Sequence, residues 1–113
     1  MATCLFCSIV SGESPADVVH STDSVLAFRD ARPVAPTHVL IIPKEHVSSA
    51  ADLRAEHASM LTDVFNTASH LAATEGLDDG WRVVTNVGPH AGQSVLHLHF
   101  HLLGGRHLGW PPG

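Results

Sequence analysis

Apolar and polar positions alternate near the end of the chain, and this alternation predicts a β-strand over residues 95–103. Large apolar side chains stand at Leu98, Phe100 and Leu102, and each polar position between them is a histidine. Successive side chains of a strand point to opposite faces of its sheet, so the apolar set would enter the core while the histidines share the other face. The pattern therefore predicts a half-buried strand that carries a polar row.

Shorter apolar runs, each bounded by turn-forming residues, predict four further strands. We expect them at residues 18–20, 24–28, 38–42 and 81–86. The first two flank a Ser-Thr-Asp sequence, which is typical of a hairpin. The third is rich in β-branched residues and is closed by Pro43, which indicates a central strand buried on both faces. Residues 30–37 and 87–94 contain Pro or Gly and are expected to be loops.

One long segment has helical periodicity. Between residues 49 and 73 apolar side chains recur every three or four positions, Ser49 can cap the first turn, and Gly76 can end the helix. A shorter apolar run over residues 4–10 ends at Gly12 and indicates a short N-terminal helix. Several strands joined by tight loops, with one main helix before the last two, predict an α+β domain with an antiparallel sheet.

Length and charge narrow the class of protein. A chain of 113 residues predicts a single domain spanning residues 1–113. Eleven acidic residues against six scattered basic residues give a formal net charge of -5, so we expect no nucleic-acid partner. No apolar stretch approaches the roughly 20 residues that cross a bilayer, and no basic segment precedes an apolar run at the N-terminus. These features predict a cytoplasmic protein without a membrane partner.

The polar row of the last strand consists of His97, His99 and His101. Histidine titrates near neutral pH and serves as a base, a nucleophile or a metal ligand. Three histidines on one rigid support therefore favour catalysis or metal binding. The alternative is a solvated strand face whose polar positions happen to be histidine.

The alternating run resembles the signature of the histidine triad superfamily, and it reads His97-Leu98-His99-Phe100-His101-Leu102-Leu103 in this chain. Further segments are similar to the nucleoside phosphoramidase branch of that superfamily. They are Leu26-Ala27-Phe28 followed by Asp30, Ala35-Pro36-Thr37-His38, Ile42-Pro43-Lys44, Gly92-Gln93-Ser94, and Gly104-Gly105-Arg106 with Trp110-Pro111-Pro112-Gly113. The resemblance runs from about residue 4 to the C-terminus and implies the superfamily's fold, a nucleotide substrate and a homodimer.

His99 is the candidate nucleophile. A neutral imidazole with one ring nitrogen hydrogen-bonded can attack phosphorus with the other, and water later cleaves the nucleotidyl-imidazole. The resemblance assigns this role to the middle histidine as well. We expect His101 to donate to the α-phosphate oxygens and His97 to orient the strand. His38 would approach from the side and give a proton to the leaving amine, and a strand-edge histidine without a function is the alternative.

Polar groups for the phosphate and the ribose are expected in loops. Backbone N–H groups of the turn Gly92-Gln93-Ser94, with the Ser94 hydroxyl, would assist His101. Asp30 follows a predicted strand and is suited to accept hydrogen bonds from both ribose hydroxyls, a role that the resemblance also implies. The resemblance places Asn86 near the sugar and phosphate, and a strand-end cap is the alternative.

The base needs an apolar slot. We expect its walls to be Leu5, Phe6, Phe28 and Leu40, with ordinary core packing as the alternative for each. Trp110, on a short Pro-rich tail, is expected to pack on its own domain or to reach the partner's site. The contact surfaces of the homodimer would be the long helix and the strand at 81–86.

Cys4 and Cys7 are the only cysteines and have the two-residue spacing of a zinc half-site. Two further ligands would complete a tetrahedron, and the resemblance to bacterial members of the superfamily implies His46 and His97. Four protein ligands leave no open position, so the zinc would be structural. Two buried thiols are the alternative, and no organic cofactor is expected.

Three hypotheses of function remain open. The first, favoured by the C-terminal Trp-Pro-Pro-Gly, is hydrolysis of purine nucleoside 5'-phosphoramidates or acyl-nucleotides to the nucleoside monophosphate. The second is cleavage of dinucleoside polyphosphates, or nucleotidyl transfer from an adenylylsulfate-type substrate. The third is a non-catalytic nucleotide-binding or interaction module, which the presence of His99, His101 and Ser94 disfavours.

Overall fold

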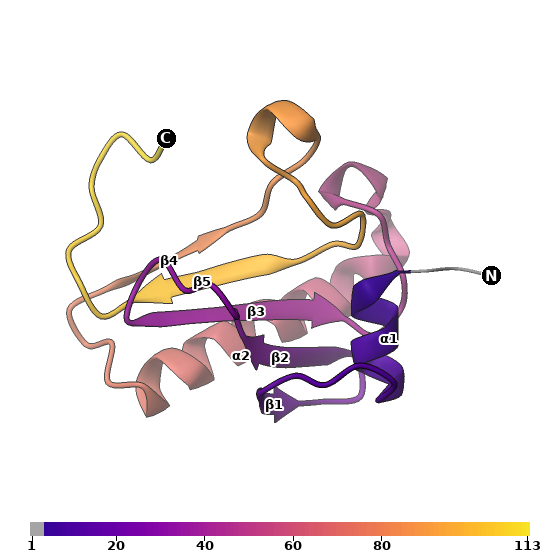
Figure 1. Ribbon diagram of the computed structural model, residues 1–113, viewed down its shortest axis with the longest axis horizontal. Coiled ribbons are helices and arrows are strands. Elements are labelled where there is room, and N and C mark those ends of the chain that lie inside the picture. The colour runs from indigo at the N-terminus through magenta and orange to yellow at the C-terminus, as the bar shows by residue number, and fades with distance from the viewer. Residues whose placement is uncertain (1–3) are drawn as a thin grey trace.

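The computed structural model describes residues 4–113, so residues 1–3 of the expected domain lie outside the described part. Five antiparallel strands form one sheet in the order β1-β2-β3-β5-β4 (Figure 1). The strands are β1 (Val18–Ser21), β2 (Val25–Arg29), β3 (Thr37–Pro43), β4 (Trp81–Val84) and β5 (Phe100–Gly104). The helices are α1 (Leu5–Ser11) and α2 (Ala58–Thr74), with 3-10 turns at Ala50–Asp52, Ala55–His57 and Pro89–Ala91. The predicted α+β class, with one main helix and a short N-terminal helix, is confirmed.

The predicted hairpin and central strand are also confirmed. β1 pairs with β2, and β3 lies between β2 and β5 with every residue buried. A β-branched apolar run without a polar face suits this position, because β3 is covered on both sides. Side chains on β3 and on the neighbouring strands are therefore held in fixed positions.

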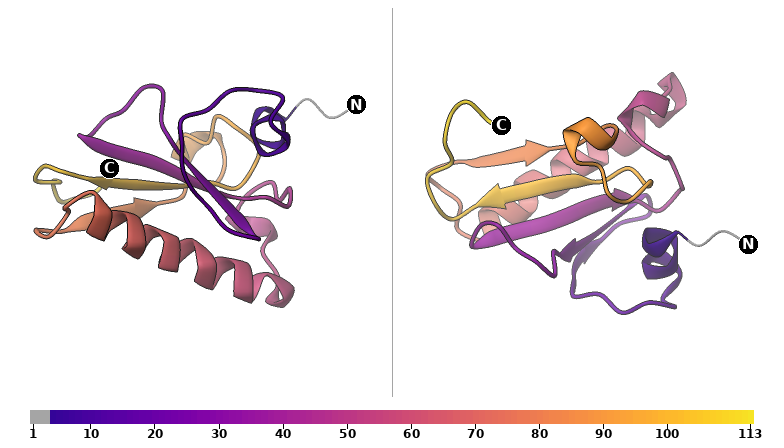
Figure 2. Two further views of the ribbon diagram at one scale, coloured as in Figure 1. Left: turned by 90° about the horizontal axis from the view of Figure 1, so that it is seen from below. Right: turned by 45° about the horizontal axis from the view of Figure 1, so that its top comes forward.

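The long helix α2 lies across one face of the sheet (Figure 2). Its apolar stripe meets the alternate strand residues that point to that face, as the period of two requires. This core contains Met60, Val64, Ala68 and Leu71 of α2 with Val25, Ala27, Val39, Ile41, Phe100 and Leu102 of the sheet. No helix within residues 4–113 is long and apolar enough to cross a membrane.

The opposite face carries α1. Phe6 of α1 packs in a second core against Leu26, Phe28, Leu40 and Ile42. The Cys4 side chain caps α1 by accepting a hydrogen bond from the backbone N–H of Cys7, with a distance of 3.3 Å between nitrogen and sulfur. The short helix is thus fixed at its start by a thiol and in its first turn by an aromatic ring.

The last strand is shorter than predicted. The sequence predicts a strand over 95–103, whereas β5 begins at Phe100 and extends to Gly104. The backbone N–H of Leu98 donates to the carbonyl of Val47 at 2.6 Å, so this segment is held by a loop instead of a neighbouring strand. The prediction of one strand carrying all three histidines is therefore wrong: only His101 lies on β5.

Two other boundaries differ from the predictions. The expected helix over 49–73 is interrupted, because Leu53 and Arg54 are extended and separate the first 3-10 turn from the second, which leads directly into α2. Ser49 does cap, but it caps the first 3-10 turn, where the backbone N–H of Ala51 donates to its hydroxyl at 3.2 Å. β4 ends at Val84, two residues before the predicted end of that strand. Apolar spacing alone did not reveal these breaks.

Candidate active site

His38 of β3 and His101 of β5 lie side by side on the face that carries α1. Their Nε2 and Nδ1 atoms are 2.9 Å apart, a hydrogen-bond distance. The backbone N–H of Val34 donates to His38 Nδ1 at 3.1 Å, so in the neutral ring the proton must sit on Nε2. His38 therefore donates to His101 Nδ1, and the proton of neutral His101 is left on its Nε2. The hydrogen-bond chain runs in one direction, from backbone to His38 to His101.

Asp30, directly after β2, touches the same pair. Its Oδ2 lies 3.3 Å from His38 Nε2, and its Oδ1 accepts a hydrogen bond from the backbone N–H of Arg32 at 2.8 Å. Burial lowers the pKa of His101 to about 4, with smaller contributions from His99 and His38 and an opposing one from Asp30. Burial likewise lowers the pKa of His38 against the attraction of Asp30. Both rings are neutral near pH 7, as the directed hydrogen-bond chain requires.

His99 is buried just before β5, with its ring beside His101 at 5.1 Å between centroids. Its Nδ1–H donates to the backbone carbonyl of His97 at 2.7 Å, which leaves Nε2 with its lone pair free. The Phe6 ring packs edge to face against His99 at 5.1 Å. The carbonyl of His99 accepts a hydrogen bond from the Thr85 hydroxyl at 2.8 Å. The ring is thus fixed in position while one nitrogen stays available.

Cys4, Cys7, His46 and His97 form a separate cluster whose ligand atoms all lie within 4.8 Å of one another. The Sγ of Cys4 and the Nδ1 of His97 are 3.3 Å apart, as are Cys7 Sγ and His46 Nδ1. The two Nδ1 atoms are 3.2 Å apart. In a tetrahedron around zinc, ligands at about 2.0–2.3 Å from the metal are about 3.3–3.8 Å from each other. The cluster fits this geometry.

The hydrogen bonds of His97 also fit a metal ligand. Its Nε2–H donates to the carbonyl of Pro43 at 2.9 Å, so the lone pair belongs to Nδ1, the nitrogen that faces the two cysteines. His97 is fully buried, and its own carbonyl receives the Nδ1–H of His99. His97 therefore connects the cluster of two cysteines and two histidines to His99.

Asp30, His38 and His101 form a second group whose ligand atoms lie within 4.8 Å. The hydrogen bond from Val34 to His38 Nδ1 argues against a metal there, because it puts the proton on the Nε2 that would have to bind the ion. The same test that supports metal at the cysteine cluster thus disfavours it here. These three residues are better suited to proton and hydrogen-bond chemistry.

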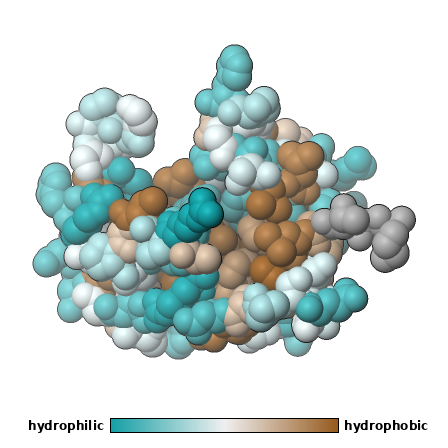
Figure 3. All heavy atoms as spheres, in the orientation of Figure 1, coloured by the Kyte–Doolittle hydropathy of each residue, from teal (hydrophilic) through white to brown (hydrophobic). Residues whose placement is uncertain are grey.

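The predicted base slot is largely core. Phe6, Phe28 and Leu40 are buried in the second core, whereas Leu5 is 51% exposed on α1. Figure 3 shows apolar atoms gathered beside α1 on this face. Trp110 is 82% exposed, with the guanidinium of Arg82 5.9 Å from its ring.

The predicted phosphate loop is folded by one of its own side chains. Gln93 accepts a hydrogen bond from the backbone N–H of Gly88 at 3.0 Å and donates to the carbonyls of Ser48 and Val95 at 2.8 and 3.1 Å. Ser94 next to it is exposed, and Asn86 is half-buried. The hydrogen bonds of Gln93 thus hold the loop in its conformation, and the exposed Ser94 side chain is accessible to a ligand.

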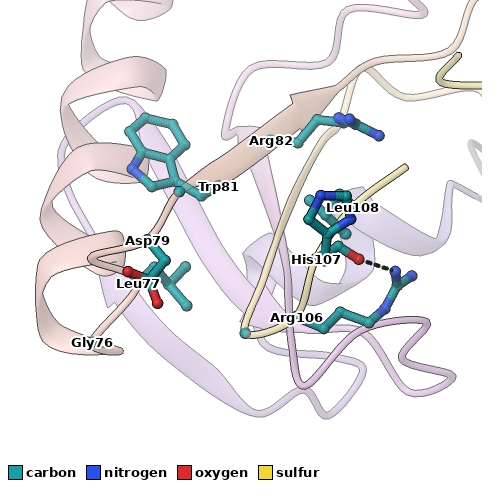
Figure 4. A pocket seen from close by; sticks show the side chains of 10 residues that line it. Gly76, Leu77, Asp79, Trp81, Arg82, Arg106, His107 and Leu108 are labelled. Carbon is teal, nitrogen blue, oxygen red and sulfur yellow. Dashed lines mark hydrogen bonds between the residues drawn. The ribbon is translucent and has the colours of Figure 1, made fainter. Parts of the chain in front are cut away.

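Three residues near the site were missed by the sequence analysis: Val34, Thr85 and Arg106. Val34 acts through its backbone, for which no sequence signal exists. Arg106 was noticed only as the end of a Gly-Gly-Arg sequence. It also lines a pocket of about 620 Å³ between the 76–82 and 105–108 segments, which is separate from the histidine site (Figure 4).

Comparison with known proteins points to one family. The model of the HIT domain matches residues 11–108. The purine nucleoside phosphoramidase of Escherichia coli is 45% identical over 106 residues, which cover 93% of this chain and 89% of that protein. The 14 kDa zinc-binding protein of Zea mays is 48% identical over 111 residues, or 96% of this chain and 87% of that protein. The crystal structure of a HIT family hydrolase from Legionella pneumophila Philadelphia 1 has a TM-score of 0.96 and 50% identity, covering 98% and 100% of the two chains.

Proposed function

The chain belongs to the HIT domain family and is one of its nucleotide hydrolases, and on that premise we propose that it cleaves purine nucleoside 5'-phosphoramidates or acyl-nucleotides. The product is the nucleoside monophosphate, formed through a covalent nucleotidyl intermediate on His99. The observation that carries the proposal is the 2.7 Å hydrogen bond from His99 Nδ1–H to the His97 carbonyl. It leaves Nε2 as the only free nucleophilic nitrogen of that ring.

In the first step, His99 Nε2 attacks the α-phosphorus and the bond from phosphorus to the leaving amine breaks. The amine takes a proton as it leaves. We propose that this proton comes from His101 Nε2–H and that a solvent proton replaces it there. His38, 2.9 Å from His101 Nδ1, supports the transfer by donating to that nitrogen. His101 Nε2–H, which has no partner among the described residues, donates to the phosphate oxygens where charge develops. Ser94 and the backbone N–H groups of its loop assist.

In the second step, water attacks phosphorus and breaks the bond to His99 Nε2. The proton that water loses passes to solvent, which balances the solvent proton taken up in the first step. His38 and His101 are again neutral, and so is His99. Asp30 accepts hydrogen bonds from the ribose hydroxyls, and Asn86 lies near the sugar and phosphate. The base lies against the exposed Leu5 and the edges of Phe6, Phe28 and Leu40.

Zinc bound by Cys4, Cys7, His46 and His97 would be structural, because all four positions are filled by protein and none is left for substrate. The name of the Zea mays relative, a zinc-binding protein, supports the choice of metal. When bound, the metal supplies a fixed geometry and no reacting group. His97 then orients the backbone carbonyl that holds His99.

The proposed assembly is a homodimer through β4 and α2. β4 is at the edge of the sheet, and Trp81 on β4, Phe65 on α2 and Val87 after β4 are exposed apolar residues. An unpaired strand edge beside apolar side chains is a typical surface for a second copy. Sedimentation equilibrium of wild type and of the Phe65→Lys and Trp81→Lys variants tests this: a wild-type monomer would contradict it.

The activity is tested by kcat/KM on three substrates: adenosine 5'-phosphoramidate, a diadenosine polyphosphate and adenylylsulfate. We expect the phosphoramidate to be the best by at least about tenfold, because the pair of neutral imidazoles is suited to a leaving amine. A preference for either of the other two would favour the second enzymatic hypothesis. Tight nucleotide binding with no turnover of all three would favour a non-catalytic module.

A further inference from the structure

Arg106 is the second residue after β5, and its guanidinium is hydrogen-bonded on both sides. One nitrogen donates to the carbonyl of Val34 at 3.0 Å and another to the carbonyl of His107 at 3.0 Å. Figure 4 shows the second of these bonds. The planar fork of the guanidinium is suited to such a bridge. Arg106 therefore ties the segment after β5 to the loop before β3.

Gly105 packs against the same loop. Its φ is +92°, and a Cβ built on it would lie 2.8 Å from the Cβ of Pro36. A side chain at Gly105 would push the proline ring away, and the ring is rigid. Gly105 and Arg106 together thus hold the loop over residues 31–36 by close packing at one end and by a charge-assisted hydrogen bond in the middle.

Burial of Ala35 also anchors the loop, but the side chain of Val34 does not. The Val34 side chain is 61% exposed, so burial of that side chain does not fix the backbone there. Yet the N–H of Val34 is the group that donates to His38 Nδ1 at 3.1 Å. The position of this one peptide, together with Asp30 Oδ2 at 3.3 Å from Nε2, sets which nitrogen of His38 carries the proton.

We propose that Arg106, supported by Gly105, is a positioning residue that fixes the tautomer of His38 and, through it, the direction of the hydrogen bond to His101. The catalytic consequence rests on the proposed function, but the tautomer itself does not.

The consequence of losing the tie follows from the donors and acceptors of the two rings. If the Val34 N–H moves away, His38 can carry its proton on Nδ1 and accept at Nε2 from His101 Nδ1–H. His101 Nε2 would then hold a lone pair and could not donate to the phosphate oxygens. The charged or titratable groups that face His38 are Asp30 and His101, with His99 beside His101. None of them replaces the Val34 N–H at His38 Nδ1.

The test is the ring ¹⁵N chemical shifts of His38 in wild type, Arg106→Ala and Arg106→Lys, which distinguish the two tautomers directly. We expect only the Nε2–H tautomer in wild type and a mixture in Arg106→Ala. Lysine can bridge only one carbonyl at a time, so Arg106→Lys should recover part of the wild-type signal. Arg106 is exposed, so we expect the fold to survive its removal.

Arg32→Ala is the matched control, since it removes an arginine charge from the loop that Arg106 binds, and the Arg32 side chain has no hydrogen bond within residues 4–113. We expect it to leave both the tautomer and kcat unchanged. Arg106→Ala should lower kcat about tenfold with little change in KM. A positioned acid or base contributes roughly 10²–10⁴-fold to the rate, and a mixture of tautomers should lose only part of that contribution.

A pure Nε2–H tautomer of His38 in Arg106→Ala would overturn the proposal, and so would a wild-type kcat in a variant with mixed tautomers. If wild type hydrolyses none of the substrates, the proposed function fails, while the ¹⁵N shifts still decide on the role of Arg106.

Discussion

Zinc removal gives a sharp stability prediction, because Cys4 has two separable roles. Its Sγ caps α1 by accepting from the Cys7 backbone N–H at 3.3 Å, and it also lies 3.3 Å from His97 Nδ1 within the four-ligand cluster. Serine is among the best N-cap residues but a poor zinc ligand. Cys4→Ser therefore removes the metal site while it keeps the cap.

The magnitude follows from linkage. A metal that binds only the folded chain, at a free concentration of about 1,000 times its Kd, adds about 4 kcal/mol to the free energy of unfolding. For a domain of this size about 4 °C of Tm corresponds to 1 kcal/mol, so chelation should lower the wild-type Tm by about 15 °C. Cys4→Ser should melt within about 3 °C of metal-free wild type, with or without chelator.

The assay is differential scanning calorimetry in excess zinc and in excess chelator, together with metal analysis, which should find about one zinc per wild-type chain. Ser11→Ala is the control, because it alters the same helix without touching the cluster and should keep the full response to the chelator. The reasoning would be refuted by a wild-type Tm that is unchanged by the chelator or by a Cys4→Ser variant that retains zinc. The first result would show that Cys4 and Cys7 are ordinary thiols that bind no stabilising metal.

Two further predictions concern the histidine site. Asp30→Ala should reduce the preference for ribose over deoxyribose substrates by about tenfold in kcat/KM, because the carboxylate loses its partner when the hydroxyl is absent; an unchanged preference would exclude Asp30 as the ribose ligand. As pH falls from about 6.5 towards about 4, the unfolded His101 ring takes up a proton that the folded ring does not, so wild-type Tm should fall in this window and His101→Gln should fall less. Equal losses in both proteins would show that His101 is not the group responsible.

The sequence predicted the elements whose pattern is local and strong. The run before Pro43 became the fully buried β3, and the apolar stripe of residues 60–72 became the core face of α2. The prediction from sequence was wrong where a contact between residues far apart in the chain competes with the local pattern. Residues 95–99 alternate like a strand, yet the Leu98 N–H bonds to Val47, about fifty positions away, and the ladder starts only at Phe100.

The sequence predicted which residues form the site, but not the hydrogen bonds and contacts between them. The spacing of Cys4 and Cys7 identifies half of the metal cluster, while His46 and His97 came from the family resemblance. The 2.9 Å contact of His38 with His101 depends on the register between β3 and β5, which no local pattern encodes. The hydrogen bond of Val34 to His38 uses a backbone group, so the side-chain sequence carries no trace of it.

The central claim is that His99 forms the covalent intermediate, and mass spectrometry of protein denatured during turnover of adenosine 5'-phosphoramidate tests it most directly. We predict a nucleotidyl adduct on the peptide that contains His99, and a His99→Ala variant with kcat lower by about 10⁴-fold that still binds the nucleoside monophosphate. His90→Ala, which changes an exposed histidine outside the site, should form the adduct like wild type. An adduct on another residue, or a His99→Ala variant that keeps most of its kcat, would contradict the account.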